Sequence, residues 1–118
     1  MRTKAITFDT VRQIGLDLAG VEESTMYGAP ALKLKGKLLT CIPSHKSAEP
    51  DSLAISIGFA EREDLLREAP ETYYVKEHYI NYPIVLVRMS RINVDQLHDL
   101  LNLSFRFVSA KNRRSRKS

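Results

Sequence analysis

Three lysines at alternating positions are well placed to bind phosphate groups. Lys33, Lys35 and Lys37 lie in a segment that also contains alternating leucines. Side chains at every second position of a strand project from one face, about 7 Å apart, so these lysines can follow a nucleic-acid backbone. The same pattern is typical of an exposed strand face that lysine keeps soluble and protects from edge pairing. The residues alone leave both interpretations open.

The C-terminal segment 111–118 is a second cationic feature. It contains no acid and five positive charges, at Lys111, Arg113, Arg114, Arg116 and Lys117. Such a segment can bind phosphates, an acidic protein or an anionic membrane surface, without base specificity. A disordered solubility tail is the alternative.

The net charge of +4 is unevenly distributed along the 118 residues. Outside segment 111–118, the chain holds 13 Lys and Arg against 14 Asp and Glu. The body is therefore close to neutral, and the positive charge is concentrated on one predicted hairpin and one terminus. Arg88 adds a cation on a predicted strand, as a ligand contact or as an ion-pair partner for an acid, and the ion pair is favoured.

Aromatic residues form a further candidate set, predicted to gather at one end of the sheet. They are Tyr27, Tyr73, Tyr74, His78, Tyr79 and Tyr82. Tyrosines beside basic groups can stack on nucleic-acid bases or line a small-molecule pocket. Ordinary packing, with the hydroxyl groups at the rim, is the expectation for most of them.

No catalytic or metal-binding pattern is found. His78 could act as a general base, but no carboxylate or nucleophile is placed beside it by spacing. His45, His78 and His98 are scattered and Cys41 is isolated, so nothing matches zinc-ligand spacing. The sequence also lacks a glycine-rich phosphate loop. We therefore predict a protein that is not an enzyme and uses no cofactor.

The elements that must position these residues follow from periodicity and turn residues. Helices are predicted over residues 8–19, 60–69 and 94–109, the last with a capping box between Asn93 and Gln96. Strands are predicted over residues 23–27, 31–35, 38–42, 52–57, 72–75 and 84–89, with a turn at Gly36-Lys37. Segment 84–89, apolar on both faces, is expected to be the central strand. Residues 43–51 read as a mobile loop.

This order predicts an α+β fold with a mostly antiparallel sheet and the N- and C-terminal helices on one face. Residues 1–110 are expected to form a single domain, and residues 111–118 a disordered basic tail. The single cysteine, with neither a signal peptide nor a membrane span in the sequence, predicts a cytoplasmic location.

Several segments together resemble the MmcQ/YjbR family. They are residues 21–31 (VEESTMYGAPA), 35–37 (KGK), 74–75 (YV) and 78–88 (HYINYPIVLVR). The resemblance covers about residues 8–110 and implies a double-wing fold similar to that of CyaY, with a DNA-binding role. The iron-binding ridge of CyaY-type proteins is acidic, whereas the first helix here offers only Asp9 and Asp17 with Arg12 between them, so metal binding is not predicted.

The leading hypothesis is therefore a DNA-binding module. It would use Lys33, Lys35, Lys37, Arg88 and the cations of segment 111–118. The alternative is a domain that binds a small ligand or a partner protein through Tyr27, His78, Tyr79 and Tyr82. The sequence leaves the oligomeric state open.

Overall fold

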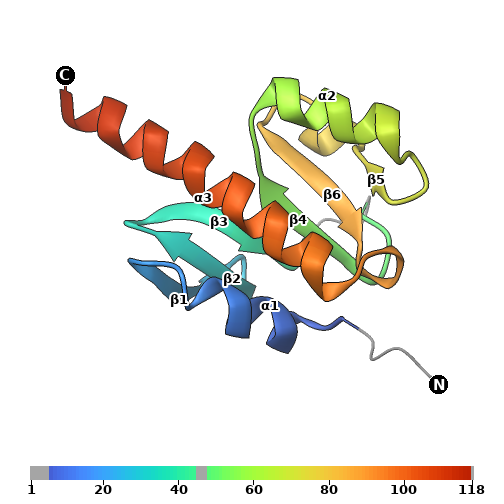
Figure 1. Ribbon diagram of the computed structural model, residues 1–118, viewed down its shortest axis with the longest axis horizontal. Helices are drawn as coiled ribbons and strands as arrows, with labels where there is room; N and C mark the ends of the chain where they lie inside the picture. The colour runs from blue at the N-terminus through green and yellow to red at the C-terminus, as the bar shows by residue number, and fades with distance from the viewer. Residues whose placement is uncertain (1–5, 45–47, 118) are drawn as a thin grey trace.

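The structure, a computed structural model, describes residues 6–44 and 48–117. The elements are α1 (Phe8–Gly15), β1 (Val21–Met26), β2 (Ala29–Leu34), β3 (Lys37–Cys41), β4 (Ser52–Ser56), α2 (Phe59–Glu68), β5 (Tyr73–Tyr74), η1 (Glu77–Tyr79), β6 (Ile84–Arg88), η2 (Met89–Arg91) and α3 (Val94–Lys117). The strands form one antiparallel sheet in the order β1-β2-β3-β4-β6-β5 (Figure 1). The predicted α+β class and antiparallel sheet are confirmed, and the arrangement is double-wing-like.

α1 and α3 cover one face of the sheet, as predicted. Alternate strand residues supply the core on this face, namely Leu32, Leu34, Leu53, Ile55, Val85 and Val87. Val11 of α1 and Leu97 and Leu101 of α3 are completely buried against them. A Cβ atom on Gly15 would overlap a methyl group of Leu32, which accounts for a glycine at a helical position.

The terminal helices differ from prediction at their ends. α1 stops at Gly15 instead of residue 19, and the chain then turns through Gly20, which has a φ of +85°. The predicted capping box of α3 is confirmed: the Asn93 amide donates to Gln96 Oε1 at 2.9 Å, and the Gln96 amide donates to Asn93 Oδ1 at 2.8 Å. α3 does not end near residue 109 but continues through Lys117, so residues 111–117 are helical instead of forming a disordered tail.

The turn between β2 and β3 lies one residue earlier than predicted. Lys35 and Gly36 have φ values of +51° and +82°, the two-residue geometry of a tight hairpin turn. Lys33 is therefore on β2, Lys35 is in the turn, and Lys37 begins β3 opposite Leu34. The expectation that the three lysines share one strand face is wrong.

The sheet is divided into two wings, which we define as β1-β2-β3 and β4-β6-β5. β3 and β4 pair only at Thr40 with Ile55 and at Cys41 with Ala54. Beyond this point the wings separate, and α3 lies across the gap (Figure 1). Ser104 of α3 donates a hydrogen bond of 3.1 Å to the carbonyl oxygen of Leu39, a group that β4 does not pair.

β6 is buried on both faces, as predicted, but it is not the central strand. Val85, Leu86 and Val87 have no exposed surface. β6 lies one strand from the edge, which β5 forms with only two residues. Part of the predicted mobile loop, residues 45–47, lies outside the described residues.

Candidate functional site

The sheet face opposite α1 and α3 contains a hollow between the two wings. Its volume is about 860 Å³, and we call it the aromatic hollow. The lining residues are Met26, Tyr27, Leu38, Cys41, Ile42, Pro43, Ser44, Ala54, Tyr79, Tyr82 and Ile84. Alternation along the strands places Met26, Ala54 and Ile84 on this face, because their neighbours Leu53, Ile55 and Val85 face the helices.

Three of the predicted rim residues meet in this hollow. Tyr27 is 88% exposed and Tyr82 is 56% exposed, whereas Tyr79 is buried. The backbone of His78 lies in η1, and its side chain is outside the described part of the structure. Of the alternative set Tyr27, His78, Tyr79 and Tyr82, the three tyrosines therefore line one concavity, and ligand binding there stays a prediction.

Tyr73 and Tyr74 do not belong to this rim. Tyr73 is buried in the main core, and Tyr74 lies at the far edge of the open face in contact with Arg88. Their predicted packing role is confirmed for both residues.

A second hollow of about 280 Å³ adjoins the first, and we call it the cationic hollow. It is lined by Gly36, Lys37, Leu38, Ser56, Tyr82, Pro83, Ile84, Phe107, Val108 and Lys111. Leu38, Tyr82 and Ile84 line both hollows, so the two form one continuous groove. The hairpin tip and the basic end of α3, which the sequence presented as separate features, therefore meet at one place.

The charge in this groove is positive. Among the described residues that line the two hollows, none is Asp or Glu, whereas Lys37 and Lys111 are present. The Nζ atom of Lys111 lies 5.3 Å from the ring centroid of Phe107. Lys33, Lys35 and Lys37 form no ion pair with any described carboxylate, so their charges are available to a ligand.

The remaining predicted cations occupy the end of α3. Arg113, Arg114, Arg116 and Lys117 lie in its last helical turns. In Figure 1 this end of α3 projects beyond the sheet. The backbone of α3 therefore continues from Lys111, which lines the cationic hollow, through these four residues.

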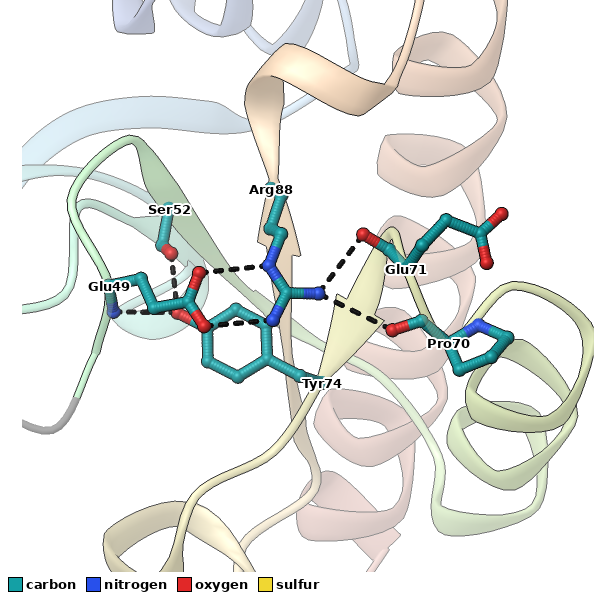
Figure 2. A network of polar contacts seen from close by, with 6 residues as sticks. All are labelled: Glu49, Ser52, Pro70, Glu71, Tyr74 and Arg88. Carbon is teal, nitrogen blue, oxygen red and sulfur yellow. Dashed lines mark hydrogen bonds and ion pairs between the residues drawn. The ribbon is translucent and has the colours of Figure 1, made fainter.

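Arg88 is partly exposed and forms an ion pair with an acid, as the favoured interpretation predicted. Its Nε and Nη2 atoms donate to Glu49 Oε1 and Oε2 at 2.9 and 2.8 Å, and Nη1 donates to the carbonyl oxygen of Glu71 at 3.0 Å (Figure 2). The guanidinium also stacks 4.5 Å from the ring centroid of Tyr74, whose hydroxyl bonds Ser52. This bidentate pair stabilises the fold and removes Arg88 from the groove.

Arg62 is a residue that the sequence analysis missed. It is 4% exposed, and its guanidinium donates to the carbonyl oxygens of Ile80 at 3.0 Å, Tyr82 at 2.8 Å and Ile84 at 3.2 Å. The bonds fix the loop that carries Tyr82. Helical spacing contained a signal, because Arg62 shares the apolar stripe of α2 with Leu65 and Ala69.

The described residues do not support a nucleophilic site or a metal-binding site. Cys41 lines the aromatic hollow but is buried, and burial raises the pKa of its thiol to about 11. The thiol is therefore protonated at neutral pH. Within residues 6–44 and 48–117, no three His, Cys, Asp or Glu side chains are grouped to hold a metal ion, and no helix is long and apolar enough to cross a membrane.

The comparisons with known proteins support the fold only. No family model and no curated protein matches the sequence. The chain is similar to the crystal structure of protein DR2400 from Deinococcus radiodurans, which contains a DUF419 domain. The TM-score is 0.75 at 18% identity, over 95% of this chain and 85% of that one. This likeness shows a shared architecture and not a shared activity.

Proposed function

We propose that this protein is a nucleic-acid-binding module without enzymatic activity, and that its nucleic acid is DNA. The observation that carries this proposal is the groove between the wings, where Lys37 and Lys111 are present and no described lining residue is Asp or Glu. Lys33 and Lys35 flank it on the same hairpin. Arg88, which was part of the predicted DNA-binding set, is left out because Glu49 neutralises it.

Two further lines are part of the same proposal. The ordered motifs at residues 21–31 and 78–88, together with the shared architecture, support distant membership of the MmcQ/YjbR family. The cytoplasmic location inferred from the single cysteine fits a protein that meets nucleic acid, and it stays a prediction.

Fluorescence anisotropy with labelled oligonucleotides tests the proposal. The full chain should bind at micromolar concentration with an affinity that falls as salt rises, because each phosphate contact releases counterions. A chain ending at Ala110 should bind more weakly, since it lacks Lys111 and the other cations of the α3 end while keeping the buried Val108.

Arg91→Gln provides the matched control for charge. Arg91 is exposed and precedes α3, so it lies at the end of the helix opposite Lys111. Lys37→Gln should weaken binding, and Arg91→Gln should not. Absence of salt-dependent binding, or equal losses in the two variants, would refute the proposal.

A second candidate function is favoured by the aromatic hollow taken alone. Its volume and its predominantly apolar lining fit a small ligand or the side chains of a partner protein. Tyr27 and Tyr82 would be the main contacts. Saturable binding of a small aromatic probe that is insensitive to salt and unchanged by Lys37→Gln would support this function over the first.

A further inference from the structure

We propose that the groove receives a single strand of nucleic acid, with unpaired bases in the aromatic hollow and phosphates at Lys37 and Lys111. This inference rests on the proposed function and specifies its ligand. The geometry that points to it is the shared wall of Leu38, Tyr82 and Ile84, which places an aromatic surface directly beside a cationic one. A nucleotide chain has the matching pattern, since each planar base is attached to an anionic backbone.

The exposure of two tyrosines supports a contact of this kind. Tyr27 and Tyr82 are far more exposed than large aromatic residues usually are, and both line one concavity. A duplex hides the faces of its bases and would offer these rings nothing to stack on. In single strands every base presents a π-face, and such stacking tolerates any sequence.

The backbone at Tyr27 supports a functional role for this ring. Tyr27 and Gly28 form the turn between β1 and β2, with φ values of +52° and +81°. Asn, Asp or Gly is the usual first residue of such a turn, because bulky side chains are strained at positive φ. The Tyr27 ring gains little burial in return for this strain, and it stands at the hollow, where a planar base can stack on it.

Tyr82 is presented by a rigid support. Arg62 donates to the carbonyl oxygen of Tyr82 at 2.8 Å and to that of Ile80, two residues earlier, at 3.0 Å. Because these bonds fix the loop before a ligand arrives, binding costs little further conformational entropy. Arg62 is thus a positioning residue for the stacking surface.

The test compares three oligonucleotides of equal length with the full chain: a single strand, a duplex, and a single strand whose sites are all abasic. The chain has five tyrosines and no tryptophan, so quenching of its intrinsic fluorescence reports on tyrosine stacking. We expect the single strand to bind at least about tenfold more tightly than the abasic strand and to quench the emission. The duplex should bind more weakly than the single strand and quench little.

Variants separate stacking from charge. Tyr82→Leu should lose about tenfold in affinity for the single strand and nothing for the abasic strand, and Tyr82→Phe should restore the affinity. Phe8→Leu is the matched control, because this aromatic ring lies on α1, on the other face of the sheet. A change of binding in Phe8→Leu equal to that in Tyr82→Leu would overturn the assignment.

The remaining outcomes distinguish the single-strand inference from the proposed nucleic-acid-binding function. Equal affinity for the single strand and the abasic strand would overturn the base site and leave the nucleic-acid function standing. Absence of binding to all three oligonucleotides would overturn both. If a mononucleotide binds as tightly as the oligonucleotide, the groove is a small-ligand site and the claim that it binds a strand is overturned.

Discussion

Two regions of the sheet, the β5 edge and the gap between the wings, differ in how their polar and aromatic side chains are used. At the β5 edge, Arg88, Glu49 and Tyr74 bind one another, so their charges and rings are used within the fold (Figure 2). At the gap between the wings, Lys37 and Tyr82 line an open groove. The same residue types thus stabilise the protein at the β5 edge and are available for binding at the gap between the wings.

The largest effect is expected on stability, from Arg62, which joins α2 to the wall of the groove. Arg62→Met should lower the free energy of unfolding by about 3 kcal/mol, because three part-buried carbonyl groups lose the buried guanidinium that donates to them. Urea denaturation measures the change. Arg67→Met, which removes an exposed ion pair with Asp64 on the same helix, should cost about 0.5 kcal/mol or less. Similar losses in both variants would contradict the assigned role.

The next effect should appear in binding without a change in stability. The double variant Lys37→Gln/Lys111→Gln should bind a single strand about tenfold more weakly and reduce the slope of log affinity against log salt by about 1.4. Its urea midpoint should match that of the wild type, because neither lysine pairs with a described carboxylate. An unchanged salt slope would place the phosphates elsewhere.

At the β5 edge, the Arg88–Glu49 pair should make the stability of the protein depend on pH. The hydrogen bonds from Arg88 lower the pKa of Glu49, so the pair stabilises the fold above the ordinary carboxyl pKa, and this contribution is lost as the pH falls through the lowered value. Glu49→Gln should therefore be less stable than the wild type at pH 7, and the two should converge at low pH. Thermal melts from pH 7 to pH 3 measure this difference. Oligonucleotide binding at pH 7 should be unchanged in Glu49→Gln.

The last prediction concerns the chemical reactivity of Cys41, which lines the aromatic hollow. Because burial raises its thiol pKa to about 11, alkylation of the folded protein by iodoacetamide at neutral pH should be much slower than that of the unfolded chain. Mass spectrometry follows the modification. Rapid alkylation at pH 7 would mean that the hollow is deeper and wetter than described.

Much of the fold could be predicted from local patterns. The Asn93–Gln96 cap and the alternation of Leu53 and Ile55 act over a few residues, so the sequence displays them directly. The turn was misplaced by one residue, because Gly36 fits either position of a two-residue turn and only pairing with β3 decides. The length of α3 was also missed, since residues 111–117 have no apolar periodicity to reveal a helix.

The residues of the site could be predicted from the sequence, but the fact that they lie together could not. The lysines, the tyrosines and the basic segment were each visible in the sequence. Their meeting depends on the divergence of β3 from β4 after two paired positions and on the passage of α3 across the gap. Both are long-range properties of the sheet. The partner of Arg88 was equally invisible, because Glu49 lies 39 residues away along the chain.

The most direct test of this contrast is an NMR titration of the full chain with a single-stranded oligonucleotide, followed through backbone amide shifts. We predict the largest changes at Lys37, Leu38, Tyr82 and Lys111, and none at Ser52, Tyr74 and Arg88. Shifts centred on Tyr74 and Arg88, or no shifts at all at saturating oligonucleotide, would contradict the account.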